Sequence, residues 1–369
     1  MRILSIESSC DETGAAVVEK NGNTIKVLSN TIASSSDMHA ATGGIIPENA
    51  AREQVKSIIP VIINALLKYK NIKPVNNQED FVTASRILKE EIDTIAVTYG
   101  PGLIGSLIIG VETTKTLSYA FKKPIIPVNH LLAHLYANFI APEKLNPKSL
   151  TLDANVFPFI GLIVSGGHTD LLYFKSHTDF KWLGGTRDDA AGEAIDKIGR
   201  MLNLPYPAGP EMEKRAKNAK DSHLKFQSPM IGSKDYDFSF SGLKAETMRF
   251  VKNNTLSEEL KDQICYAVQS AIFKVLIKKT LEATTEYSCD TVLLGGGVSA
   301  SSTLLESMKY EATSLAESRR GIKNQELRIF SPEKQYATDN AAMIGAYALI
   351  NGEEKNWKEF KSNPELYFA

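Results

Sequence analysis

Two histidines spaced four residues apart give the strongest indication of chemistry in this sequence. His130 and His134 belong to the run Asn129-His-Leu-Leu-Ala-His. Residues at positions i and i+4 share one face of a helix, so both imidazoles can reach the same metal ion. Asn129 is a favourable N-cap for that helix. The spacing predicts a divalent-metal site, and it leaves open the alternative of a histidine pair that only packs or meets solvent.

Such a site needs a further ligand, for which Asp339 is the best candidate. This residue precedes the apolar helix expected over 341–350. Two neutral imidazoles and one carboxylate, with other coordination positions open, suit Fe(2+) or Zn(2+). The pattern differs from that of the metallopeptidases, in which a Glu follows the first histidine, because Leu131 stands at that position here.

Asp11 and Glu12 lie in the polar turn expected over residues 7–14, between the first two strands. A carboxylate in a turn is usually solvated. If this turn faces a ligand, however, a carboxylate on it could act as a base or hold a metal-bound water. We therefore predict Asp11 as the catalytic carboxylate, with Glu12 as the second candidate.

Two glycine-rich turns, Ser165-Gly166-Gly167 and Gly295-Gly296-Gly297, each follow an expected strand. Glycine allows backbone N–H groups to approach phosphate oxygens closely, and a following helix adds the positive end of its dipole. Neither turn matches the Walker or dinucleotide fingerprint, and a single turn of this kind is more often a packing feature. The presence of one in each half of the chain favours nucleotide binding.

The composition limits the class of protein. The chain has 369 residues, of which 43% are hydrophobic, and a net charge of −1. This length suggests two domains or one two-lobed body, and the charge excludes a basic footprint over the whole chain, so any RNA contact must come from local patches or a partner. Three cysteines are too few for a disulfide framework. Without a leader segment or a membrane-length apolar run, we expect a cytoplasmic protein with no membrane partner.

The apolar periodicity predicts the same order of elements in both halves of the chain. In the first half we expect strands at 2–6, 15–19 and 92–98, and helices at 47–69 and from Gly105 to about 121. In the second we expect strands at 157–164, 170–174 and 289–294, and a helix from about 299. Each half thus has a hairpin followed by a strand, a glycine loop and a helix, which predicts an α/β fold of two similar lobes with a ligand cleft. Segment 76–93 is expected to be a surface insertion and 141–155 an exposed linker.

Several longer motifs occur in a characteristic order from residue 2 to about residue 350. They are the runs at 6–13, 43–48, 100–106, 164–169, 188–193, 238–244 and 338–340, together with the histidine pair. This set closely resembles the transferase subunits of bacterial tRNA threonylcarbamoyladenosine synthase, the TsaD type. The resemblance implies the two-lobed actin/Hsp70/sugar-kinase (ASKHA) fold, with duplicated RNase H-like cores and a nucleotide cleft between the lobes. We expect the first lobe over 1–130, completed by 340–369, and the second over 131–339.

The resemblance also implies an activity. The threonylcarbamoyl group of threonylcarbamoyl-AMP would pass to N6 of the adenosine 3′-adjacent to the anticodon, in tRNAs that read codons beginning with A, and AMP would leave. The implied partners are a pseudo-enzyme sister subunit of the TsaB type and a small ATPase of the TsaE type. Two alternatives are a nucleotide-binding regulatory or scaffold subunit without turnover and, less favoured, a metallopeptidase.

The resemblance also implies roles for individual residues of this sequence that stand at the positions of the family's motifs. His130, His134 and Asp339 would hold one metal ion, with Fe(2+) preferred and Zn(2+) as the alternative. The substrate would contact the loop formed by Ile163, Val164, Ser165, Gly166 and Gly167. Its nucleotide part would be bound by Asp196, Gly209 and Ser301. Three positions depart from the family pattern, because the family usually carries Asn at Ser301 and His at Gln54, and often His at Asn129.

Overall fold

We describe the protein from a computed structural model, which defines residues 1–35, 38, 44–142, 150–152, 155–219, 222–318 and 327–368. The chain forms two compact units, Met1–Ala154 with Pro332–Ala369, and Asn155–Ser331. The sequence placed the change of lobe at 130–131 and 339–340. The unit boundaries differ because α5 (His130–Tyr136) packs against α12 (Ala341–Asn351) within the first unit.

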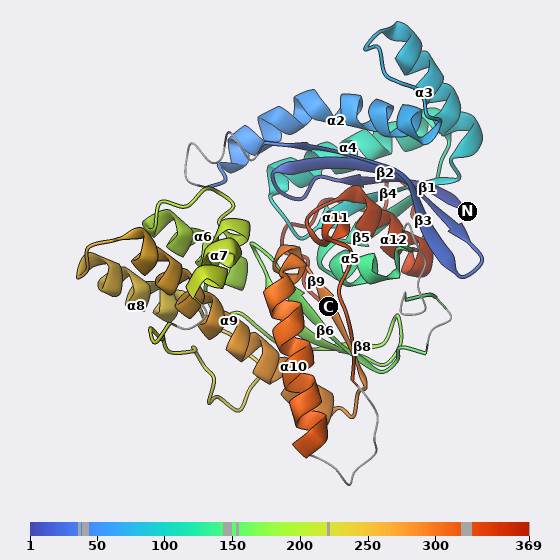
Figure 1. Cartoon of the computed structure of the whole chain (residues 1–369). Helices are drawn as coiled ribbons and strands as arrows, with labels where there is room; N and C mark the ends of the chain where they lie inside the picture. The colour runs from blue at the N-terminus through green and yellow to red at the C-terminus, as the bar shows by residue number, and fades with distance from the viewer. Residues whose placement is uncertain are drawn as a thin grey trace. The chain divides into compact units, whose positions relative to one another are not determined.

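A five-stranded mixed sheet forms the centre of the first unit, in the order β3-β2-β1-β4-β5. β1 pairs antiparallel with β2 and parallel with β4. Figure 1 shows α2 and α4 on one face of the sheet and α5 and α12 on the other. Because helices cover both faces, β1 and β4 are buried almost throughout. The bounds are β1 (Arg2–Glu7), β2 (Glu12–Asn21), β3 (Thr24–Ser34), α2 (Pro47–Tyr69), α3 (Gln78–Glu91), β4 (Thr94–Gly100), α4 (Ile104–Phe121), β5 (Ile125–Asn129), η1 (Ala137–Phe139) and α11 (Lys334–Ala337).

The second unit has its own five-stranded sheet, in the order β10-β9-β6-β7-β8. β6 pairs antiparallel with β7 and parallel with β9, and the long helix α9 packs against β6. The bounds are β6 (Phe159–Val164), β7 (Thr169–Phe174), β8 (Phe180–Gly185), α6 (Ala191–Met201), α7 (Gly209–Ala216), η2 (Lys217–Ala219), α8 (Ser241–Lys252), α9 (Glu258–Glu286), β9 (Thr291–Gly295), η3 (Gly297–Ala300), α10 (Ser302–Ser318) and β10 (Arg328–Phe330).

The two sheets have the same topology. If β1 to β5 are matched with β6 to β10 in chain order, corresponding strands have corresponding neighbours. In both sheets the first strand in chain order pairs antiparallel with the second and parallel with the fourth. The duplicated α/β architecture predicted from the sequence is therefore confirmed. Among the helices that the structure describes, none is both long and apolar enough to cross a membrane.

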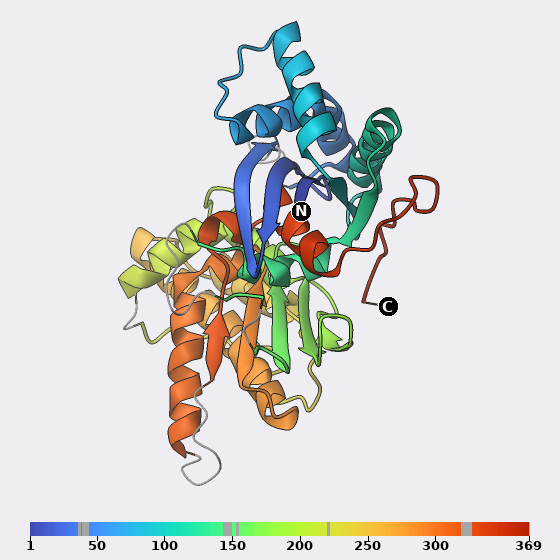
Figure 2. The ribbon, with the colours of Figure 1, turned by 90° about the vertical axis from the view of Figure 1, so that its right-hand side faces the viewer.

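Several elements differ from the sequence expectation. The expected surface insertion 76–93 contains α3, and its Ala84, Ile87 and Leu88 are buried in the core of the first unit. Sequence periodicity did not identify β3, β8 or α9. The helix expected from 299 begins at Ser302, after η3. Most of the expected linker, 143–149 and 153–154, lies outside the described residues. The C-terminal segment runs beside α4 (Figure 2), and its Trp357 ring meets that of Tyr119 edge to face.

Candidate active site

The histidine pair lies at the start of α5, directly after the edge strand β5. The Asn129 side-chain oxygen accepts hydrogen bonds from the backbone N–H groups of Leu131 and Leu132, at 2.9 and 3.2 Å. This confirms Asn129 as the N-cap. The ring centroids of His130 and His134 are 4.7 Å apart, and both side chains are buried. The two imidazoles therefore share one helix face, as their spacing predicts.

Asp339 comes from the returning C-terminal segment. Its Oδ1 lies 3.3 Å from His134 Nε2 and 3.6 Å from His130 Nε2. The next residue, Asn340, fixes the backbone on both sides: its amide donates to the carbonyl oxygens of Tyr336 and Thr338, and its Oδ1 accepts from Met343 N–H at the start of α12. The structure thus brings together the three predicted ligands, one ligand atom from each lying within 4.8 Å of the others.

These residues fit a divalent metal ion. Nδ1 of the fully buried His134 has no hydrogen-bond partner among the described residues, and its Nε2 faces the Asp339 carboxylate at 3.3 Å. An unpaired buried polar atom is costly, and native structures seldom leave one without a role. Two imidazoles and a carboxylate are the donor set that Fe(2+) and Zn(2+) accept, and the set alone does not distinguish these metals.

Glu7 is a participant that sequence reasoning missed. Its buried carboxylate lies 3.1 Å from His130 Nδ1 and also accepts hydrogen bonds from Ser9 N–H and the Thr98 hydroxyl. A carboxylate bound to one ring nitrogen fixes the tautomer and turns the other nitrogen toward the metal position. The sequence gives only one hint, because Glu7 is a charged residue that directly follows the apolar residues Ile3, Leu4 and Ile6 of the strand.

Burial and charge act in opposite directions on these groups. Burial lowers the pKa of His130, but the carboxylates of Glu7 and Asp339 outweigh it and raise that pKa to about 9. Burial raises the pKa of Glu7, but the charge and hydrogen bond of His130 outweigh it and hold the pKa below its ordinary value. For His134, burial dominates and lowers the pKa. In the chain by itself, His130 and Glu7 therefore form a buried ion pair beside an imidazole that burial keeps neutral, and a cation bound at His130 Nε2 would replace the proton there.

The predicted catalytic carboxylates lie where β1 turns into β2. Asp11 is in the turn, and Glu12 begins β2. Burial, with the nearby carboxylates of Asp339 and Asp11, raises the pKa of Glu12 to about 10. Glu12 then holds a proton at neutral pH. A cation bound to Asp339 would weaken the repulsion from the Asp339 carboxylate and so reduce the rise in the pKa of Glu12. The electrostatic influence of Asp339 on Glu12 places this turn in the neighbourhood of the histidine–aspartate group.

The expected substrate loop joins β6 to β7 in the second unit. It begins in the buried strand end of Ile163 and Val164, and Ser165 closes a tight turn by accepting from His168 N–H. Gly296, with φ of +91°, approaches this loop so closely that a Cβ on it would lie 2.4 Å from the Val164 carbonyl oxygen. A Cβ on Gly192, at the start of α6, would lie 2.5 Å from the Ser165 carbonyl oxygen. The two glycine turns therefore meet, with packing as one reason for the glycines.

The three expected nucleotide-binding residues are linked through α7. Asp196 accepts from the backbone N–H of Ala208, directly before Gly209, at 2.7 Å. Glu213 of α7 accepts from three groups of Ser302 and Thr303 at the start of α10, next to Ser301. A Cβ on Gly209 would meet no atom within 4 Å in the described part of the chain. The second unit thus presents the N-termini of α7 and α10, with space at Gly209.

Other charged candidates have structural partners. Glu193 and Lys197 form an ion pair at 2.8 Å, and Lys197 also binds Asp189. Lysine and arginine also cluster at 214–220 and 319–323 in the sequence, and a charge run is usually a solvated face. In the first cluster, Arg215 pairs with Glu258 and Asp262. Lys220 and the second cluster lie outside the described residues.

Comparison with known proteins gives a consistent result. The family model for tRNA N6-adenosine threonylcarbamoyltransferase (TsaD) matches residues 26–346. Proteins of that name are similar over nearly the whole chain. The one from Moorella thermoacetica is 40% identical and covers 99% of this chain and 96% of its own length. The one from Persephonella marina is 41% identical and covers 93% and 88%.

The structure is also similar to a solved structure, that of HypF from T. kodakarensis. The TM-score is 0.55 at 13% sequence identity, over 95% of this chain and 49% of HypF. This chain therefore spans about half the length of HypF. At this identity the likeness is one of fold, and it supports the ASKHA-type architecture expected from the sequence.

Proposed function

The chain belongs to the family of tRNA N6-adenosine threonylcarbamoyltransferases, and we propose that it transfers the threonylcarbamoyl group of threonylcarbamoyl-AMP to tRNA. The acceptor is N6 of the adenosine 3′-adjacent to the anticodon, in tRNAs that read codons beginning with A. Sequence identity of about 40% over nearly the full length carries this proposal. Its general form, threonylcarbamoylation of a tRNA adenosine by a transferase, follows from the family itself.

The reaction makes one bond and breaks one. The N6 lone pair attacks the carbamoyl carbon, the bond from that carbon to the phosphate oxygen breaks, and AMP leaves with the electron pair. The N6 nitrogen loses a proton. An adenine amine is a weak nucleophile, so orientation and removal of that proton are the tasks for the protein. We assign them to Asp11, because Glu12 is the carboxyl whose pKa is raised to about 10.

His130, His134 and Asp339 would hold one divalent ion, with Fe(2+) preferred and Zn(2+) as the alternative. When bound, such an ion supplies Lewis-acid stabilisation of charge that develops on phosphate or carbonyl oxygen. Glu7 keeps His130 oriented through Nδ1, and Asn340 keeps Asp339 in place. These two contacts support assignment of the group as a binding centre rather than a chance cluster.

The donor's nucleotide part is assigned to the second unit. The backbone of Ile163, Val164, Ser165, Gly166 and Gly167 would contact the substrate, and Asp196, Gly209 and Ser301 would bind its AMP portion. What supports this is the open space at Gly209 beside a helix N-terminus, where backbone N–H groups favour an anion. Ser301 offers a hydroxyl where the family usually has an amide, and that hydroxyl already accepts from Leu304 N–H.

We also propose that the chain works with partners in the cytoplasm: a TsaB-type sister subunit and a TsaE-type ATPase. The net charge of −1 supports help from another protein in positioning tRNA. Large apolar side chains are exposed on the neighbouring helices α2 and α4, which supports a protein-docking face: Val55, Ile59, Ile104 and Ile108. The comparisons do not favour the regulatory-subunit or metallopeptidase alternatives.

The test is a reconstituted assay with unmodified tRNA, threonylcarbamoyl-AMP and the partner proteins, read by mass spectrometry of the digested nucleosides. Wild type should form threonylcarbamoyladenosine, and both Asp11→Asn and His130→Ala should lose at least about 100-fold in rate. Wild-type turnover in Asp11→Asn would remove the assignment of the base. No product from wild type, with partners shown to be active, would remove the transfer itself.

A further inference from the structure

The turn that carries Asp11 and Glu12 is held by three elements of the first unit. Three successive peptide groups surround these two residues, and their carbonyl oxygens belong to Cys10, Asp11 and Glu12. Each of the three oxygens accepts a hydrogen bond from a side chain outside the turn. Backbone position in this turn is therefore set by its surroundings as well as by its own sequence.

Gln54 makes the most direct of these contacts. It is the eighth residue of α2, it is 1% exposed, and its Nε2 donates to Cys10 O at 2.9 Å and to Glu12 O at 3.0 Å. One nitrogen thus ties together the two peptide groups that bracket Asp11 and Glu12. A side-chain amide has two N–H donors on one nitrogen, and both are used here.

The orientation of this amide is set by its neighbours. Both nearby backbone groups are acceptors, so the nitrogen must face them. The amide oxygen of Gln54 is left buried, with no hydrogen-bond partner in the part of the chain that the structure describes. Burying an unpaired oxygen is unfavourable. The orientation that makes the two hydrogen bonds to the turn therefore leaves the amide oxygen unpaired. This favours a functional reason for placing Gln54 here.

Two serines complete the contacts. Ser106, buried in the first turn of α4, donates its hydroxyl to Cys10 O at 3.0 Å. Ser35, just after β3, donates its hydroxyl to Asp11 O at 2.8 Å. The middle peptide group is therefore bound from the β3 side, while the outer two are bound from α2 and α4.

We propose that Gln54 is a positioning residue, which sets the direction of the Asp11 and Glu12 carboxyl groups by clamping the peptide groups on either side of them. The proposal rests on the function proposed above. Gln54 touches neither the predicted ligands nor the predicted substrate residues by any hydrogen bond in the described part of the chain, so it acts through the turn. It also gives a role to a position where the sequence departs from the usual histidine.

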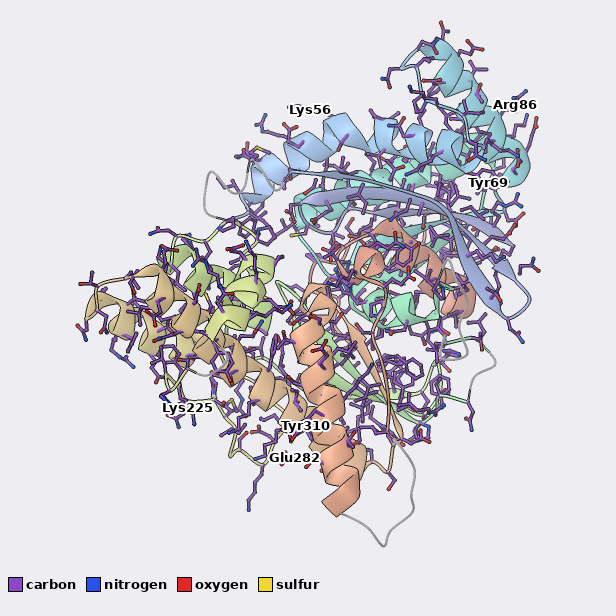
Figure 3. All side chains as sticks on the ribbon, viewed as in Figure 1. Lys56, Tyr69, Arg86, Lys225, Glu282 and Tyr310 are labelled. Carbon is purple, nitrogen blue, oxygen red and sulfur yellow. The ribbon has the colours of Figure 1, made fainter. Side chains whose placement is uncertain are left out.

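The orientation of α2 explains why Gln54 can reach the turn. Lys56, two residues after Gln54, projects from the outer side of the helix in Figure 3 and is largely exposed. Ser57, one turn after Gln54, faces inward and donates to the Thr13 hydroxyl at 3.1 Å. Gln54 and Ser57 therefore form a short polar strip on an otherwise apolar buried face, opposite the turn and the start of β2.

The main variant is Gln54→Met, which keeps the length of the side chain and removes both donors. The matched control is Ser29→Ala. Ser29 donates to Ala65 O of the same helix at 2.7 Å, so the control removes a buried bond between α2 and the same sheet, away from the turn. Gln54→His is the rescue variant, because a neutral imidazole retains one N–H donor.

We expect kcat of Gln54→Met to fall by about 10- to 100-fold at saturating donor and tRNA, with each KM within about threefold of wild type. Amide hydrogen exchange in the peptide covering residues 8–13 should be at least about tenfold faster, with metal content unchanged. Ser29→Ala should keep kcat within about twofold of wild type and leave exchange in that peptide unchanged. This should hold even if its unfolding midpoint falls as far as that of Gln54→Met. Gln54→His should recover part of kcat.

Unchanged exchange at 8–13 in Gln54→Met would overturn the proposal, as would a kcat within about twofold of wild type. An equal loss of kcat in Ser29→Ala would assign the effect to stability. If wild type itself forms no modified adenosine, the proposed function fails, and the exchange measurement alone decides whether Gln54 holds the turn.

Discussion

The two units share one sheet topology but carry different chemistry at the same place in it. In the first unit, carboxyl groups stand at the end of β1 (Glu7), in the turn after it (Asp11) and at the start of β2 (Glu12), and the pKa values of Glu7 and Glu12 are shifted in opposite directions. In the second unit, the matching turn after β6 is Ser165-Gly166-Gly167-His168 and brings no carboxylate. The sheet fixes where the turn lies, and the turn residues decide whether the position serves acid–base chemistry or close backbone contact.

The units agree, however, in how the next strand packs on that turn. After β4, a Cβ on Gly102 would lie 2.5 Å from the carbonyl oxygen of Ser9, and after β9, a Cβ on Gly296 would lie 2.4 Å from that of Val164. In both cases the glycine faces the backbone at or just after the end of the strand that comes first in its unit, β1 or β6. Glycine at these two loops is therefore required by packing, and a glycine-rich loop is by itself weak evidence for phosphate binding.

A second difference lies in the segment after the last strand of each sheet. β5 leads directly into α5, which carries the histidine pair. β10 instead leads out of the second unit, and the chain then supplies Asp339 to the first. The three predicted metal ligands therefore belong to one unit, although more than 200 residues separate Asp339 from His134 in the sequence.

The largest expected effect contrasts the two units directly. Asp339→Asn should lose bound metal and at least about 100-fold in activity, because a neutral amide replaces the charged ligand. Asp196→Asn in the second unit should lower activity through donor binding while metal content stays at the wild-type level. Elemental analysis of purified protein and the nucleoside assay measure both. Equal metal content in the two variants would contradict the assignment of Asp339.

The histidine pair was predictable because it has local markers, whereas no local pattern places Asp339 beside it. The i, i+4 spacing of the histidines and the Asn129 cap are short-range patterns, and each has the local structure that its type predicts. The duplicated hairpins were predictable for the same reason, since period-two and period-3.6 patterns are local.

Glu7 and Gln54 could not be predicted in this way. Their partners are His130, 123 residues away, and the turn, 42 to 44 residues away. A buried polar residue in an apolar strand or helix face indicates that a partner exists, but not which one. Helix α3 was missed as a core element because its sequence is rich in charged residues and its exposed face includes Phe81 and Val82, so that the three apolar residues that are buried, Ala84, Ile87 and Leu88, do not stand out.

The next largest effect tests the packing reason for glycine. Gly296→Ala should reduce the free energy of unfolding by about 2–4 kcal/mol, because the residue has φ of +91° and its Cβ would meet the Val164 backbone. Gly166→Ala, in the facing turn, should change it by no more than about 0.5 kcal/mol, because a Cβ there meets no described atom within 4 Å. Denaturant unfolding compares the two variants. Similar losses would show that the close approach to Val164 is not the cause.

An effect of intermediate size tests burial of a carboxyl in the second unit. Burial raises the pKa of Asp170 to about 6, although the Trp182 indole N–H donates to it at 3.0 Å. A raised pKa means that the folded state holds the proton more tightly. Its contribution to stability is therefore fully present below about pH 4 and is lost as the pH rises through about 6.

Asp170→Asn removes that titration. Relative to wild type, the variant should gain about 2–3 kcal/mol in unfolding free energy between about pH 4 and pH 8. The change in this free-energy difference between about pH 4 and pH 8 matters more than its value at either pH. The reason is that the new amide donors of the variant destabilise the fold by an amount that does not depend on pH. Denaturant titrations at both values measure it, and parallel pH profiles for the two proteins would show that Asp170 is not held protonated.

The smallest effect compares the helix caps at the two sites. Asn129→Ala removes both hydrogen bonds to the first turn of α5 and should lower the unfolding free energy by about 1 kcal/mol. Ser301→Ala removes one bond to α10, where Glu213 still accepts from Thr303 N–H, so a loss nearer about 0.5 kcal/mol is expected. Only Asn129→Ala should also weaken metal binding, because His130 is the first residue of the helix that it caps. Denaturant unfolding and a metal titration separate the two effects, and metal affinity that falls equally in both variants would show that the cap of α5 has no special part in placing the histidines.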